Sequence, residues 1–253
     1  MVREDSPLRH PPRDLSRGQV LILDGIRYSG DMADLAYERL ASHLQRVAAL
    51  ETEPTVGDIA TAMLDAWSIV DSAHRFRDLV ANLPGVSNLP WKRLLLMRTE
   101  DVADLRNRVQ HQLGELDGLL SAGGQLWGYI SWHELRDGRA TGRWHMMAAG
   151  ADYVGDRWIF MGPARLPFVA PRDRIRLNAF ARQVYLARTV AALRQAIGSL
   201  EAELSAGLVR AVDAPVLDRR GADAVMVGVV EVFRKTPSAA QKGANIDSCD
   251  DAV

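Results

Sequence analysis

Apolar residues recur every three or four positions in three segments of the first half of the chain. The segments are residues 29–50, 55–83 and 94–120. This spacing lines one face of an α-helix with apolar side chains. Ser29 can cap the first segment, and the second ends at Pro84-Gly85, a pair that terminates helices. The pattern therefore predicts three long helices.

The periodicity changes after the pair Gly123-Gly124. Short runs rich in aromatic and branched residues follow, with Asp137-Gly138 and Gly155-Asp156 as turns between them. Such runs predict a meander of short antiparallel strands. The predicted strands of the meander are residues 125–135, 143–149 and 157–161, and residues 174–180 can add a further strand.

One further helix and one further strand complete the pattern. Residues 182–208 have the spacing of a helix that packs on the sheet. The run 224–233 suits a closing buried strand or a short helix. We therefore expect an α+β fold, in which an N-terminal antiparallel helical bundle is followed by a small antiparallel sheet packed with a long helix. The expected divisions are a disordered tail over 1–18, a helical domain over 19–123, an α+β domain over 124–236 and a disordered tail over 237–253.

Composition narrows the classes of function. The chain has 31 basic and 32 acidic residues, so no net field draws it to nucleic acid or to a membrane surface. Cys249 is the only cysteine, which excludes an intrachain disulfide and a cysteine-based zinc site. No apolar run approaches the ~20 residues that cross a bilayer, and the charged, proline-containing start does not resemble a signal peptide. We expect a soluble cytoplasmic protein that has no contact with membrane.

The segment Arg106-Asn107-Arg108-Val109-Gln110-His111 combines cations, an amide and an imidazole within the predicted third helix. At about 100° per residue, Asn107, Arg108 and His111 share one side, opposite the apolar stripe. Arg106 lies about 140° from His111 on a straight helix, so these two do not converge unaided. Arg108, close to both Asp104 and His111, is the geometric competitor for the role of Arg106.

This segment resembles the motif of the HEPN superfamily, in which an arginine, often followed by a polar residue, precedes a histidine after a helical hairpin. Arg106, Asn107 and His111 match that motif in order and spacing, and the resemblance covers roughly residues 18–123. It implies a metal-independent endoribonuclease without a cofactor, with its cleft formed between two motif helices of a dimer. A ribose 2′-hydroxyl would attack the adjacent phosphate and leave a 2′,3′-cyclic phosphate.

The resemblance also implies roles for these residues. His111 would move the proton, since imidazole titrates near neutral pH. Arg106 would stabilise charge on the phosphorane, and Asn107 would orient the phosphate or the histidine. The required 2′-hydroxyl makes RNA the substrate. Basic residues near the motif are expected to bind it: Lys92, Arg93, Arg98 and Arg108.

Two functions follow from the resemblance. The first is a homodimeric RNA-cleaving enzyme of the toxin or defence type, with a neutralising or regulatory protein as a further partner. The alternative is a non-catalytic HEPN-like dimeric binding or scaffold protein, because some relatives in this superfamily keep the fold without cleavage.

Other polar and aromatic residues suggest weaker candidates. His133 and His145 lie on neighbouring predicted strands and can face each other in one register, yet two histidines make a poor metal site. Five aromatic residues of the sheet segment are candidates for a base-stacking platform, although tryptophan in a small sheet is more often core. They are Trp127, Tyr129, Trp132, Trp144 and Trp158. We expect four further residues to be solvated: Asp65, Asp71, His43 and His74.

Overall fold

The computed structural model describes residues 1–49, 53–86, 89–111, 114, 126–136, 139–150, 159–161, 175–207 and 209. Of residues 134–136, 139–143 and 159–161, only the backbone is described. Residues 1–222 form one compact unit, and residues 223–253 lie outside the described residues. The predictions for 224–233 and 237–253, together with Trp158 and Cys249, fall outside the described residues.

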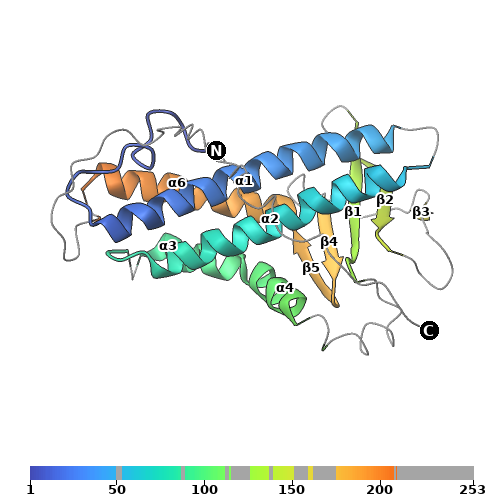
Figure 1. The fold of residues 1–253 in the computed structure, drawn as a ribbon. Coiled ribbons are helices and arrows are strands. Elements are labelled where there is room, and N and C mark those ends of the chain that lie inside the picture. Colours follow the sequence, from blue (N-terminus) through green and yellow to red (C-terminus); the bar gives the residue numbers. More distant parts are fainter. Residues whose placement is uncertain are drawn as a thin grey trace, which may run out of the picture. The chain divides into compact units, whose positions relative to one another are not determined.

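Two long helices form an antiparallel hairpin, α1 (Arg17–Ala48) and α2 (Val56–Asn82), and they pack along each other (Figure 1). Each begins with a reciprocal capping box, Ser16 with Gln19 in α1 and Thr55 with Asp58 in α2. These caps satisfy backbone N–H groups that a helix start leaves without partners. The first helix thus begins earlier than predicted, and Ser29 is a buried residue within it rather than its cap.

The described part of the predicted third helix consists of two shorter helices, α3 (Pro90–Arg98) and α4 (Glu100–Gln110). Residues 115–120 of that prediction lie outside the described residues. They meet at Thr99, whose buried hydroxyl donates to the Leu95 carbonyl at 2.8 Å. Arg77 of α2 donates to the Leu96 carbonyl and so occupies an acceptor at the end of α3. The sequence predicts that His111 lies in the middle of a helix. In the structure it is instead the C-cap of α4.

The sheet has five antiparallel strands in the order β3-β2-β1-β4-β5. They are β1 (Tyr129–Arg136), β2 (Arg139–Ala148), β3 (Ile159–Met161), β4 (Ile175–Ala179) and β5 (Arg182–Tyr185). The predicted meander is confirmed for β1, β2 and β3. The added strand β4 pairs with β1 rather than with β3, and β5 is a strand that the sequence does not predict. Phe180 and Ala181 connect β4 to β5 with positive φ values of 51° and 56°. This turn usually uses glycine or asparagine, so its sequence gives no turn signal.

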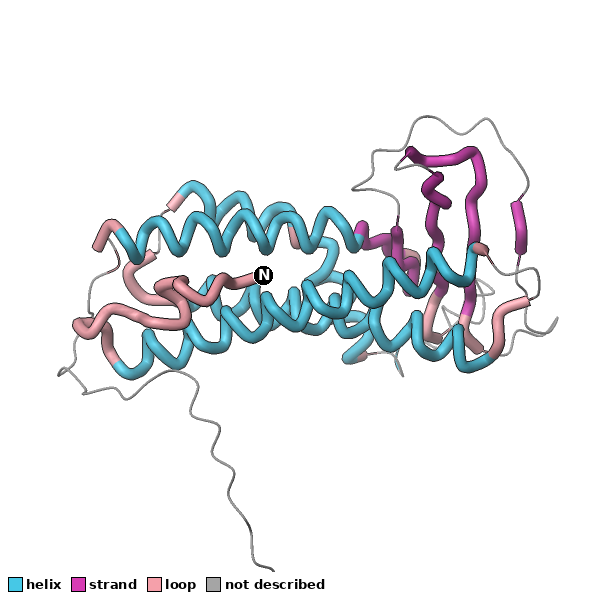
Figure 2. The backbone as a smooth tube through the Cα atoms, turned by 90° about the horizontal axis from the view of Figure 1, so that it is seen from above, coloured by secondary structure: helices cyan, strands magenta, loops and turns pink. Residues whose placement is uncertain are grey.

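The last described helix, α6 (Leu186–Ser205), follows β5 directly. It contacts β4 and β5, and it packs on α1, α2 and α3 as part of the helical bundle. At Gly30 of α1 a Cβ atom would lie 2.6 Å from Ile197 Cδ1, so glycine permits the close approach of these helices. In Figure 2 the strands gather beside one end of the helices. The predicted border near residue 123 therefore does not separate two compact units.

The N-terminal segment packs against this bundle, whereas the sequence predicts a loose tail. Val2, Leu8 and Leu15 are buried in the same core as the helices. The backbone N–H of Val2 donates to Asp31 Oδ1 of α1 at 2.9 Å. None of the helices in the described part of the chain has both the length and the apolar character needed to span a membrane.

Candidate functional site

A solvent-open hollow of about 270 Å³ lies beside α4, on the side toward β5. Asn107, Arg108 and His111 line it, and Asn107 and His111 are exposed. The remaining lining residues are Asp104 of α4 and Arg182 of β5, whose Nη2 lies 3.9 Å from Asp104 Oδ2. The structure thus brings three of the predicted site residues together. Arg182 was not predicted, because it belongs to the strand that the sequence does not reveal.

Arg106 leaves α4 on a different side, toward α2. Its Nε lies 2.6 Å from Asp71 Oδ1, in an ion pair whose side chains are 27% and 48% exposed. Arg106 does not line the hollow that contains His111. This is the arrangement expected from the 100° step of a helix, in which residues five apart point in different directions. Within one chain, the motif arginine and histidine therefore do not share the hollow.

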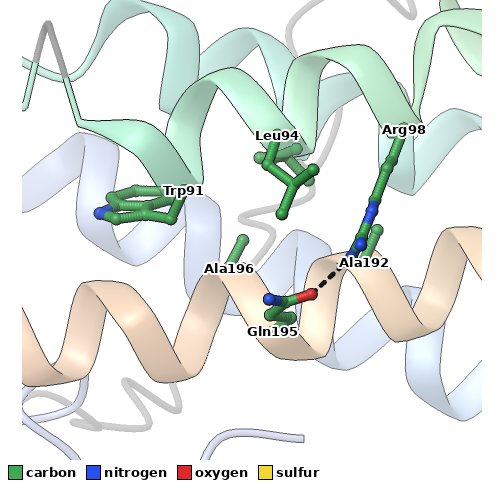
Figure 3. A pocket seen from close by; sticks show the side chains of 7 residues that line it. Trp91, Leu94, Arg98, Ala192, Gln195 and Ala196 are labelled. Carbon is green, nitrogen blue, oxygen red and sulfur yellow. Dashed lines mark hydrogen bonds between the residues drawn. The ribbon is translucent and has the colours of Figure 1, made fainter.

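Three basic residues of α3 are expected from the sequence to bind RNA. Two of them hold α3 in place. Lys92 is buried, and its Nζ donates to the Ala81 carbonyl at 2.8 Å in the last turn of α2. Burial lowers the pKa of this ammonium. Arg98 donates from Nη1 to Gln195 Oε1 of α6 at 2.6 Å, across a cavity of about 10 Å³ that Trp91 and Leu94 also line (Figure 3). Arg93 is exposed.

The two sheet histidines are on opposite faces of the sheet. The register of β1 and β2 pairs Trp132 with His145 and His133 with Trp144, and directly paired residues share a face. Burial, and secondarily the charge of Arg176, lowers the pKa of His133. The described residues contain no cluster of three or more potential metal-ligating side chains. These histidines therefore do not form the metal pair considered from the sequence.

The aromatic residues of the sheet segment divide into core and surface. Trp132 is buried and stacks on His145, with ring centroids 5.0 Å apart and an interplanar angle of 14°. Trp127 and Tyr129 are 50% and 37% exposed at the start of β1. Among the described members of this group, the two most exposed thus lie at one end of β1, and Trp132 belongs to the core.

The four residues expected to be solvated all have partners. Asp65 is buried and pairs with Arg39, next to an open hollow that His43 also lines. His43 Nε2 lies 2.9 Å from the Asp58 carbonyl oxygen, and His74 Nδ1 lies 3.1 Å from Asp78 Oδ2. Asp71, the partner of Arg106, is the residue among them that bears on the candidate site. A single sequence contains no signal for this pair, because its members are far apart in the chain.

Comparisons with protein-family models, with curated proteins and with solved structures found no match to this chain. The functional assignment therefore depends on the residues of α4 and on what surrounds them.

Proposed function

We propose that the protein is a metal-independent endoribonuclease of the HEPN type, which acts as a homodimer in a cytoplasmic toxin or defence role. The observation that supports this most is the open hollow beside α4, where an exposed imidazole and an exposed amide lie with two arginines. An imidazole can transfer protons at neutral pH, and guanidinium groups bind phosphate. The combination suits cleavage of a phosphodiester.

The proposed reaction is transesterification within the RNA backbone. The 2′-hydroxyl of a ribose attacks its 3′-phosphate, and the imidazole of His111 accepts the hydroxyl proton. Guanidinium groups stabilise the charge that develops on the phosphorane, and Asn107 orients the phosphate. The bond to the 5′-oxygen of the next nucleotide breaks. That oxygen takes up a proton, which leaves a 2′,3′-cyclic phosphate and a 5′-hydroxyl.

A second copy of the chain completes the site in this proposal. Arg106 and His111 leave α4 in different directions, so one helix does not direct both side chains at one phosphate. In a two-fold dimer with the α4 helices facing each other, Arg106 of one subunit can face His111 of its partner. Such a dimer holds two Arg–His pairs, and a neutralising protein that covers the cleft would restrain it.

A non-catalytic dimeric binding or scaffold protein is the second candidate. The ion pair between Arg106 and Asp71 favours it, because the motif arginine already has a carboxylate partner 2.6 Å away. In this second reading the role of the guanidinium is to hold α4 on α2.

The deciding experiment incubates the purified full chain with total RNA in the presence of a chelator. Wild type is expected to produce fragments with 2′,3′-cyclic phosphate ends, and His111→Ala to lose this activity. General acid–base groups contribute about 10²- to 10⁴-fold, whereas an exposed histidine contributes no more than ~0.5 kcal/mol to stability. His10→Ala, which removes an exposed histidine of the N-terminal segment, is the matched control. Full activity of His111→Ala would remove this residue from the mechanism, and inactive wild type would favour the scaffold.

A further inference from the structure

Trp127 presents an indole to solvent from a backbone that is held in place. Its side chain is 50% exposed, just before β1. The next residue, Gly128, has φ +71°, and a Cβ there would lie 2.1 Å from the Asn178 carbonyl oxygen of β4. Only glycine fits this position, so the turn is fixed against the sheet. The backbone that carries the exposed indole is therefore fixed in place.

Trp67 of α2 supports this indole from behind. The ring centroids of Trp67 and Trp127 are 6.4 Å apart with an interplanar angle of 75°, which is an edge-to-face contact. Trp67 Nε1 also donates to the Trp127 carbonyl at 3.3 Å. We call these two residues the aromatic ledge. Since Trp67 is itself nearly buried, the indole of Trp127 supplies most of the accessible surface of the ledge.

The aromatic ledge lies next to the motif arginine along α2. Trp67 and Asp71 are four residues apart, so they share one face of the helix, about 6 Å apart along its axis. Trp67 contacts Trp127, and Asp71 pairs with Arg106. An exposed aromatic ring and a guanidinium are thus held by successive turns of the same helix face.

We propose that the aromatic ledge stacks a base of single-stranded RNA close to the phosphate that Arg106 contacts. This inference rests on the proposed function, since it gives that site a base-binding position. Aromatic side chains stack on unpaired bases of any identity, and adjacent cations bind the backbone. A paired base has its faces covered by neighbouring bases, so the ledge selects single strands. The guanidinium beside the ledge favours a phosphate-bearing ligand over a purely apolar partner.

The test measures binding separately from cleavage. The probe is a short single-stranded RNA with 2′-O-methyl groups, which cannot undergo the 2′-hydroxyl attack, and its affinity is followed by fluorescence anisotropy. Trp127→Ala is expected to weaken binding by about 5- to 100-fold, and Trp127→Phe to retain most of the affinity. Tyr28→Ala is the matched control, because Tyr28 is an aromatic residue 53% exposed on α1 with Arg27 over its ring. This control should bind the probe like wild type.

The outcomes separate this inference from the proposed function. Equal affinity of wild type and Trp127→Ala would overturn the aromatic ledge even if wild type cleaves RNA, and so would failure of wild type to bind the probe. Binding that depends on Trp127 without any cleavage would support the ledge and contradict the endoribonuclease. Equal affinity for single strands and duplex would also overturn the ledge. A change in the sedimentation of Trp127→Ala with unchanged RNA binding would identify a protein contact instead.

Discussion

The two sides of α4 that flank the core differ in what they contact. On the side toward α2, Arg106 is in an ion pair with Asp71. On the side toward β5, Asp104, Arg108 and Arg182 line an open hollow with His111. One short motif thus provides both an intramolecular contact and an open surface. Neighbouring residues of a motif on a helix need not act at the same place.

The largest expected effect distinguishes the two arginines on these two sides of α4. Arg106→Ala is predicted to lower the rate of RNA cleavage by about 10²- to 10³-fold, as for the loss of a group that stabilises developing charge. Arg108→Ala is predicted to weaken RNA binding with a much smaller effect on the rate. Single-turnover cleavage measures both variants. If Arg108→Ala abolishes cleavage and Arg106→Ala does not, the hollow beside β5 is the complete site within one chain.

Asp71 decides whether the α2 side of α4 is part of the site. In the proposed enzyme this carboxylate is a positioning residue, because it fixes Arg106 through Nε and leaves the terminal nitrogens for a phosphate. Asp71→Asn is therefore expected to lower kcat about tenfold with little change in KM. The half-exposed pair adds little stability, so the melting temperature should hardly change.

Asp78→Asn is the matched control for Asp71, because Asp78 lies two turns further along α2 and pairs with His74. Asp71→Glu, which keeps the charge, should recover part of the rate. An increase in cleavage by Asp71→Asn would show that the carboxylate restrains Arg106 instead of positioning it.

His133, a buried histidine of β1, gives a smaller expected effect, on stability. The pKa of His133 is lowered in the folded state, chiefly by burial, so the unfolded chain binds this proton more readily. Its contribution to stability is present above the ordinary pKa of about 6.5 and is lost as the pH falls through the lower folded pKa. The expected loss is at most about 1.4 kcal/mol per pH unit.

Chemical denaturation between neutral and acidic pH measures this loss. His133→Gln should flatten the dependence. Arg176→Met should flatten it less, since the charge of Arg176 is the smaller cause. An unchanged slope in His133→Gln would assign the loss to other groups. The same pH dependence of stability shows whether a fall in RNA cleavage at low pH comes from unfolding of the protein or from protonation of His111.

The sequence predicts those elements whose signals are local. The apolar stripes of α1 and α2 and the alternating strands of the meander are visible without any contact information. The break at Thr99 is not, because Arg77 of another helix competes for the carbonyl at the end of α3. The strand β5 is hidden for another reason, since Phe180-Ala181 is an unusual sequence for its turn.

The candidate site shows the same division. Helical spacing correctly places Asn107, Arg108 and His111 on one side, and it correctly separates Arg106 from them. The roles of Lys92 and Arg98 depend on α2 and α6, whose positions a single sequence does not contain. The sequence also does not predict that Asp71 and Arg182 lie beside the motif, because both reach it through contacts between distant parts of the chain.

The central claim is that Arg106 of one subunit acts with His111 of the other. The direct test co-expresses Arg106→Ala and His111→Ala chains under separate tags and purifies the mixed dimer. That dimer holds one intact Arg–His pair, so it should recover about half of the wild-type cleavage while each parent variant remains inactive. A mixed dimer as inactive as its parents would contradict the claim. So would a wild-type protein that sediments as a monomer at the concentration at which it cleaves RNA.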